Sequence, residues 1–81
     1  MNEYMSKVTA FLKEQAEEEL ENITEDSQFI ADLGFNSLEM MMIVNEAETE
    51  FDITITDEEL PTLITVGDFI KLLKTQKEGE E

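Results

Sequence analysis

Ser37 is the residue of this chain with the clearest chemical use. It follows a glycine-containing turn within residues 32–39, DLGFNSLE, and stands at the start of an acidic, amphipathic segment. A serine at the N-terminus of a helix has its hydroxyl in water, beside free N–H groups and the positive end of the helix dipole. Such a position suits a bound or covalently attached phosphate group. No other residue of the chain offers a comparable chemical handle.

Two residue types that build many active sites are absent. The 81 residues include no cysteine and no histidine, which excludes disulfides, cysteine nucleophiles, histidine-based catalysis and the usual zinc sites. Residues 52–57 lack the alternating oxygen ligands and the central glycine of an EF-hand, so no metal site is predicted. Without cysteine, a signal peptide or a long apolar run, the chain is expected to be cytoplasmic.

The charge of the chain is strongly one-sided. There are 21 acids against 5 bases, a formal net charge of −16, and all five bases are lysines outside the span from Glu14 to Ile70. Such a field repels nucleic acid and anionic membranes and speeds encounters with basic protein surfaces. We therefore expect a monomer with basic protein partners, without nucleic acid and without membrane insertion. A merely solvated surface would be the other explanation of the same charge.

Apolar residues at helical spacing predict a single all-α domain. Helices are expected over residues 3–18 with Asn2 as N-cap, over 37–51, and over 65–74. Residues 20–36 are too apolar for a linker and predict an ordered loop packed over the core. Thr56 and Glu59 form a capping box that opens a short helical turn. The result is a small bundle of three main helices and one short helix over residues 1–75, followed by a flexible acidic tail, 76–81.

The same periodicity predicts which faces are buried. In the last helix the inward residues are Val66, Phe69, Ile70 and Leu73, and in the second they are Leu38, Met41, Val44 or Ile43, Ala47 and Phe51. At least one of Met40, Met41 and Met42 must face outward, since consecutive residues step by about 100° around a helix. The loop is expected to bury Phe29, Ile30, Leu33 and Phe35.

Residues 29–73 resemble an acyl carrier protein. The hallmark of that family is Asp-Ser-Leu at the start of the second helix, after Leu-Gly and one further residue, and this chain has LGFNSL at 33–38. ETEFD at 48–52 and ITDEE at 55–59 are similar to the Glu-Glu-Glu-Phe and Ile-Pro-Asp-Glu-Glu stretches of the family. Thr65-Val66 is similar to the Thr-Val that opens its last helix. Four landmarks at the right spacing make the resemblance specific.

The resemblance implies a carrier rather than an enzyme. A phosphopantetheinyl transferase would join 4'-phosphopantetheine from coenzyme A to the Ser37 hydroxyl, with Asn36 and Leu38 completing the motif. The terminal thiol of that arm would hold acyl groups as thioesters for fatty-acid or polyketide enzymes, and apolar space between the helices would shelter them. Partner enzymes with basic patches would meet Glu39, Met41, Met42, Glu46, Glu48 and Asp57.

The chain departs from the family pattern at two positions near Ser37. Asn36 replaces the usual aspartate and removes a charge where the transferases place basic groups and a metal ion, so slower priming or a dedicated transferase is expected. Met42 stands where many members carry an acid. An aminoacyl or peptidyl carrier, or an unmodified acidic adaptor that binds a basic partner, are the alternative functions. The strong acidity favours the acyl carrier, since peptidyl carriers are less acidic.

Overall fold

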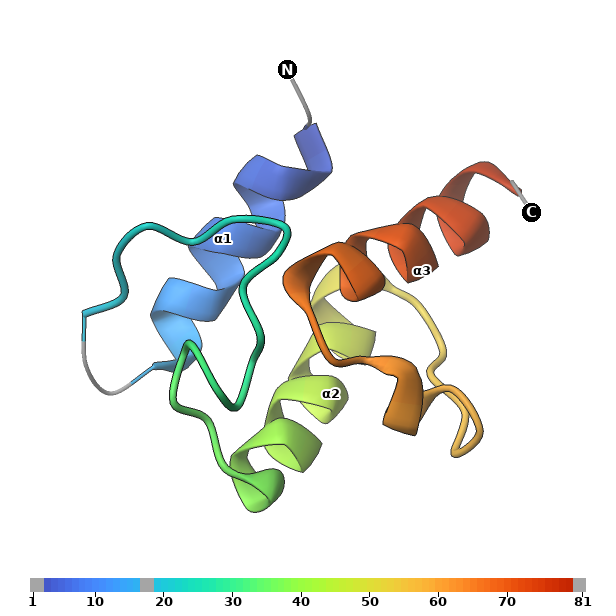
Figure 1. Ribbon diagram of the computed structural model, residues 1–81. Helices are drawn as coiled ribbons and strands as arrows, with labels where there is room; N and C mark the ends of the chain where they lie inside the picture. The colour runs from blue at the N-terminus through green and yellow to red at the C-terminus, as the bar shows by residue number, and fades with distance from the viewer. Residues whose placement is uncertain (1–2, 17–18, 80–81) are drawn as a thin grey trace.

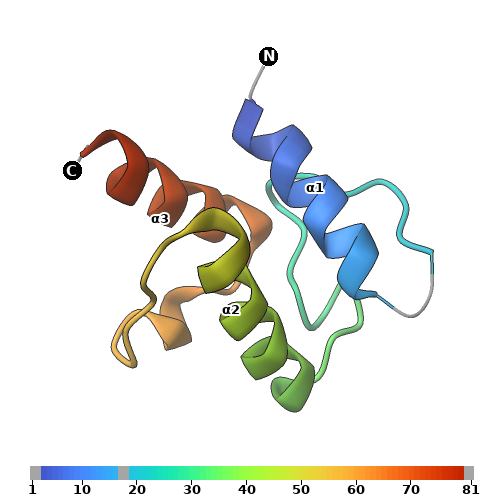
Figure 2. The ribbon, with the colours of Figure 1, turned by 180° about the vertical axis from the view of Figure 1, so that it is seen from behind.

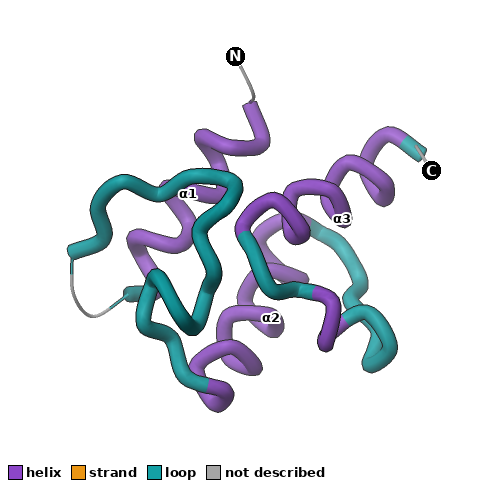
Figure 3. Tube along the Cα trace, in the orientation of Figure 1, coloured by secondary structure: helices purple, strands orange, loops and turns teal. Residues whose placement is uncertain are grey.

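The structure, a computed structural model, describes residues 3–16 and 19–79. Its elements are α1 (Glu3–Gln15), α2 (Ser37–Phe51), the short 3-10 helix η1 (Leu60–Thr62) and α3 (Val66–Glu78) (Figure 1). Two long loops join the three main helices (Figure 3). Over the described ranges there is no strand, only an isolated antiparallel bridge between Gln28 and Thr65. The predicted all-α bundle is therefore confirmed.

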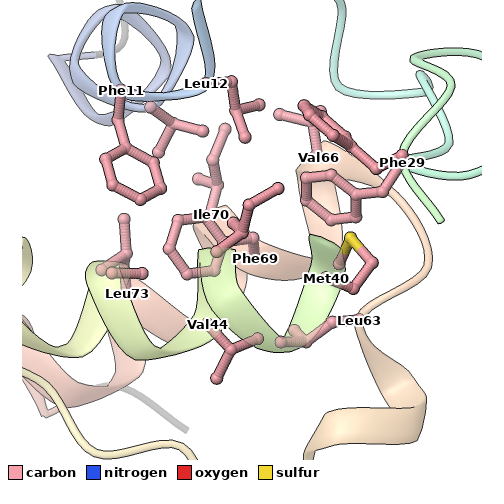
Figure 4. Packing of buried hydrophobic residues seen from close by; sticks show 14 of the residues in the cluster. Phe11, Leu12, Phe29, Met40, Val44, Leu63, Val66, Phe69, Ile70 and Leu73 are labelled. Carbon is pink, nitrogen blue, oxygen red and sulfur yellow. The ribbon is translucent and has the colours of Figure 1, made fainter. Parts of the chain in front are cut away.

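The three helices enclose one apolar core. α1 packs against α3, and the start of α1 and the end of α3 lie at one end of the molecule, with the start of α2 at the other (Figures 1 and 2). The Phe51 ring meets the rings of Phe11 and Phe69 edge-on, at centroid distances of 5.4 and 5.8 Å. Figure 4 shows the packing of 14 of the buried side chains of this core. The buried residues are Val8, Phe11, Leu12, Phe29, Phe35, Met40, Ile43, Val44, Ala47, Ile53, Leu63, Val66, Phe69, Ile70 and Leu73.

Hydrogen bonds at both ends determine where α2 begins and stops. The Asn36 side chain accepts a hydrogen bond from the Glu39 N–H, and the Glu39 carboxylate accepts one from the Asn36 N–H. This reciprocal capping box satisfies two N–H groups that the helix itself leaves free. At the other end Asp52 adopts a left-handed conformation, with φ 56°, and its N–H donates to the Glu48 carbonyl. α2 thus has the predicted bounds.

The first long loop is ordered because it is hydrogen-bonded to the start of α3. The N–H groups of Val66 and Gly67 donate to the carbonyls of Ser27 and Glu25, at 2.9 and 2.8 Å. The Phe29 N–H donates to the Ile64 carbonyl at 3.0 Å, and this pairing holds the Phe29 side chain over the core. The predicted packing of the loop is confirmed for its two phenylalanines, and Leu33 is half-buried.

For Ile30 the prediction of burial is wrong, because this side chain is 57% exposed. Phe29, which is hydrogen-bonded to Ile64, already occupies the position that faces the core. The next side chain along the loop is directed away from that position into solvent.

The predicted face of α2 is wrong in its first turns. Leu38 and Met41 are 68% and 56% exposed, whereas Met40 is buried. Residues spaced by three lie 300° apart around a helix, so each step of the predicted series Leu38, Met41, Val44 turns by about 60°, and only Val44 reaches the buried face. Met40 shares the buried face with Ala47, seven residues on. Met41 and Met42 face outward, which confirms that at least one of the three methionines does so.

Two predicted helix ends also differ from the structure. α1 ends at Gln15, and Asn2 and residues 17–18, where its cap and its end were predicted, lie outside the described residues. α3 continues past Lys74 to Glu78, so residues 76–78 of the predicted flexible tail are helical. The Gln76 side chain accepts from the Thr54 N–H at 3.0 Å and donates to the Thr54 carbonyl, which favours the extra turn. A domain boundary at residue 75 stays a prediction.

The short helix forms as a 3-10 helix. Thr56 and Glu59 make the predicted capping box, with the Thr56 N–H donating to the Glu59 carboxylate and the Glu59 N–H donating to Thr56 Oγ1, at 3.0 and 3.2 Å. The box encloses a turn, and the helical residues follow it at Leu60–Thr62, with Pro61 in the first turn. Proline lacks an N–H and keeps the helix short.

Candidate functional site

Ser37 combines exposure with a position at a helix start. It is the first residue of α2 and its side chain is exposed. The amides of Ser37 and Leu38, in the first turn, have no partner within the helix and carry the positive end of its dipole. Of the two other serines, Ser6 lies on α1, and Ser27 is buried with its hydroxyl accepting the Thr24 N–H at 2.9 Å. Ser37 is therefore the serine best placed to bear a phosphodiester.

An apolar groove of about 480 Å³ opens beside Ser37. Its walls come from the first loop, the first turns of α2 and the segment around η1, and they are formed by Gln28, Phe29, Ile30, Ala31, Met40, Met41, Leu60, Pro61, Leu63 and Ile64. The volume lies in the range of pockets that hold small organic ligands. Figure 4 shows Met40 between Phe29 and Leu63, and all three residues line this groove. The same three residues line a void of about 10 Å³ in the core.

Large apolar side chains are exposed on the segments that form the groove. Leu38, Met41 and Met42 come from α2, and Ile30 and Ile64 from the two loops, and each has more than half of its surface in solvent. Single exposed apolar residues are ordinary, but five from three segments that include groove-lining residues indicate a surface for another molecule. Met41 and Met42, predicted as partner contacts, are thus available for contact.

The predicted acidic residues occupy three different environments. Glu46 and Asp57 are exposed. Glu39 is half-buried in the capping box, and Glu48 is half-buried with its Oε2 accepting the Ile55 N–H at 2.8 Å. Met41, Glu48 and Asp57 line one crevice of about 130 Å³ between α2 and the loop that follows it. The fold therefore brings these three together.

The remaining candidates lie on other parts of the surface. Asn36 and Glu39 line a polar hollow with Asp32, and Met42 and Glu46 lie elsewhere on α2. In the part of the chain that the structure describes, no three carboxylates come together as a group that could hold a metal ion.

Among the acids that the structure describes, Asp68 at the start of α3 is the one whose pKa is clearly changed. The hydrogen bond from the Thr65 N–H, at 3.0 Å, is the largest cause and lowers the pKa of this carboxyl. Burial opposes this and raises the pKa, and the hydrogen bond from the Ile64 N–H, at 3.1 Å, lowers it further. The carboxylate thereby stabilises the segment that carries Leu63 and Ile64 into the groove.

Known proteins support a specific family for this fold and site. A family described as the phosphopantetheine attachment site matches residues 6–73. The acyl carrier protein of Exiguobacterium sibiricum is 45% identical over 64 residues, which cover 79% of this chain and 75% of that protein. The acyl carrier protein of Wolinella succinogenes is 40% identical over 57 residues, 70% of this chain and 75% of that protein. This chain belongs to the acyl carrier protein family.

A solved structure agrees with this assignment. A chain from Mycobacterium tuberculosis assigned as an acyl carrier protein superposes with a TM-score of 0.78, at 27% identity, over 90% of this chain and 97% of its own length. The acyl carrier protein described here therefore carries acyl groups on a phosphopantetheine arm, and it is a carrier rather than a catalyst. Among the described residues, no helix is long and apolar enough to cross a membrane.

Sequence reasoning missed several residues of this acyl carrier protein's groove. Ile30, Leu60, Pro61 and Ile64 line it, yet none is a predicted site residue. A local signal was present, because Phe29-Ile30 and Leu63-Ile64 are adjacent apolar pairs outside the helices. Neighbouring side chains on an extended backbone point to opposite sides, so one member of each pair must face away from the core.

Proposed function

We propose that Ser37 Oγ is the atom that carries the phosphopantetheine arm, and that the cargo is an acyl intermediate of fatty-acid or polyketide synthesis. The observation that supports this most directly is the exposed Ser37 hydroxyl at the start of α2, at the edge of an apolar groove. A phosphodiester there would lie near the positive end of the helix, which favours negative charge by about 0.3–1 kcal/mol. The terminal thiol of the arm supplies the thioester chemistry, which a chain without cysteine does not contain.

The groove provides a reason why an acyl group would fold back onto the protein. Burying a methylene group is worth about 0.8 kcal/mol, so a few carbons placed among Ile30, Met41 and Ile64 would already hold the cargo against the surface. Longer groups would have to pass Phe29, Met40 and Leu63 to reach the core. Methionine has a flexible side chain that adapts to irregular spaces, which makes Met40 the easiest of the three to displace.

Partner enzymes would bind the same end of the molecule. Leu38, Met41 and Met42 offer apolar contact, and Glu46 and Asp57 offer exposed negative charge. Glu39 and Glu48 add charge although their carboxylates are held by backbone N–H groups. Basic patches on a phosphopantetheinyl transferase and on acyl-transferring enzymes would complement this surface, with fast and salt-sensitive association. A monomer in the cytoplasm is part of the same proposal.

Intact-protein mass spectrometry tests the attachment site. The chain is incubated with coenzyme A, magnesium and a broad-specificity phosphopantetheinyl transferase, and we expect a gain of one phosphopantetheine. The gain should disappear in Ser37→Ala and persist in the matched control Ser6→Ala, since Ser6 is exposed on α1. A gain that survives Ser37→Ala would refute the assignment. No gain in folded wild type would favour the adaptor or a dedicated transferase.

The cargo is tested on the primed protein. Loading by a malonyl transferase of the fatty-acid or polyketide type, followed by extension with a condensing enzyme, is expected to add acyl mass to the arm. Loading instead by an amino-acid-activating enzyme would contradict the acyl assignment in favour of an aminoacyl or peptidyl carrier. High salt should slow the acyl reactions, because the attraction between charged surfaces is screened.

A further inference from the structure

Glu48 accepts hydrogen bonds from three backbone N–H groups of the loop that follows α2. Its carbonyl accepts the N–H groups of Asp52 and Ile53, which turns the backbone out of α2. Its Oε2 accepts the Ile55 N–H at 2.8 Å, seven residues along the chain. Ile53 is buried and Ile55 is packed against the core, so the bond lies in a partly buried position. One residue therefore determines the path of the loop after α2.

That path leads directly to a wall of the groove beside Ser37. Thr56 follows Ile55 and opens the capping box with Glu59. The Thr56 carbonyl then accepts the N–H groups of Glu59 and Leu60, both at 3.1 Å. Leu60 and Pro61 line the groove across from Met41 of α2. Each step from Glu48 to the groove wall is thus a hydrogen bond or a direct chain connection.

The geometry points to Glu48 as the positioning residue of this groove wall. We propose that its carboxylate fastens residues 55–60 against α2 and so keeps Leu60 and Pro61 at the distance from Met41 that shelters an attached acyl chain. The crevice of about 130 Å³ lined by Met41, Glu48 and Leu60 shows that the loop rests on α2 with space between them. Ile55 and Leu60 also pack against the core, and the hydrogen bond from the Ile55 N–H to the charged Glu48 side chain adds a specific fastening where the loop meets α2. The sheltering part of this inference rests on the proposed carrier function.

Amide hydrogen exchange on the unprimed protein tests the fastening. Glu48→Ala should speed exchange of the Ile55 amide by about tenfold to a hundredfold, the loss expected for a hydrogen bond to a charged group. Glu48→Gln keeps an acceptor oxygen and should stay close to wild type. Glu50→Ala is the matched control, an exposed acid on the same helix, and should leave the Ile55 amide unchanged. Equal exchange in wild type and Glu48→Ala would overturn the proposal.

Cargo protection tests the consequence for the groove. The protein is primed, loaded with an octanoyl group, and the rate of thioester cleavage by hydroxylamine is measured. Cleavage should be several-fold faster in Glu48→Ala than in wild type, and Glu48→Gln should restore the wild-type rate. If Glu48→Gln and Glu48→Ala speed cleavage equally, the faster cleavage comes from loss of the negative charge and not from loss of the hydrogen bond to Ile55. That result would overturn the positioning role. Failure of wild type to accept the arm would instead refute the carrier proposal and leave the exchange result intact.

Discussion

Asn36 allows the stability of the site and the rate of its modification to be changed separately. Its Oδ1 accepts the Glu39 N–H at 2.8 Å, and its own N–H donates to the Glu39 carboxylate at 2.9 Å. Asn36→Ala removes the first of these bonds, and the loss of such a cap costs about 0.5–2 kcal/mol. In a domain of this size, 1 kcal/mol corresponds to about 4–8 °C in Tm. We therefore expect Asn36→Ala to lower Tm by several degrees.

Asn36→Asp should behave differently, because Asp and Asn cap helices equally well. The new charge gains about 0.3–1 kcal/mol from the helix N-terminus and loses a comparable amount by repulsion from the Glu39 carboxylate beside it. The Tm should stay within about 3 °C of wild type, by the same conversion. Priming by a transferase with a basic binding surface should become faster, since an added exposed ion pair is worth about 0.2–1 kcal/mol, or about 1.4- to 5-fold in kcat/KM.

Thermal unfolding followed by circular dichroism and steady-state priming with a fluorescent coenzyme A measure the two effects. An unchanged Tm in Asn36→Ala would show that the capping box contributes nothing to stability. Slower priming of Asn36→Asp would show that the transferase does not recognise negative charge next to the serine. Either result would refute the corresponding step of the reasoning.

Four further perturbations follow from the fold. Leu73→Ala, at a fully buried position, should lower the free energy of unfolding in urea by about 2–5 kcal/mol, and a loss below 1 kcal/mol would contradict the packing shown. Gly67→Ala should lower Tm although alanine favours helices by about 1 kcal/mol, because the new Cβ would lie 3.0 Å from the Glu25 carbonyl oxygen, and a higher Tm would show that the loop can yield. Adding salt at neutral pH should raise Tm, since the charge of −16 repels itself, and a Tm independent of salt would refute this. The hydrogen-bonded Asp68 carboxylate has a lowered pKa in the folded state, so it stabilises the fold above about pH 4 and loses this effect as the pH falls through the folded value. The stability difference between wild type and Asp68→Asn should therefore shrink in acid, and a constant difference would exclude the carboxylate as its source.

Local signals were sufficient to predict where α2 and α3 begin and to place Ser37 at the start of α2. The Asn36 cap and the Thr65 cap are each followed three residues later by an acid, and both boxes are present in the structure. Ser37 follows from the first of them. The buried face of α3 was also predicted correctly, because its apolar residues recur at spacings of three and four, which keeps them on one side of the helix.

The groove depended on contacts between distant parts of the chain. Ile30 and Ile64 flank it because the first loop pairs with the start of α3 through Gln28 and Thr65, which are far apart in the sequence. The role of Glu48 depends on the left-handed turn at Asp52, which brings Ile55 back alongside α2. An acid on a helix surface has the same sequence pattern whether it faces solvent or binds a returning backbone N–H, so sequence alone could not separate the two.

The arrangement of the chain ends has a practical consequence for joining this carrier to other proteins. The start of α1 and the end of α3 lie at one end of the molecule, and Ser37 lies at the other (Figures 1 and 2). A linker attached beyond either helix would leave the serine, the groove and their surrounding side chains uncovered. The same domain can therefore work as a free shuttle or as a tethered module of a larger polypeptide, and it can be immobilised by either end for assays of priming and loading.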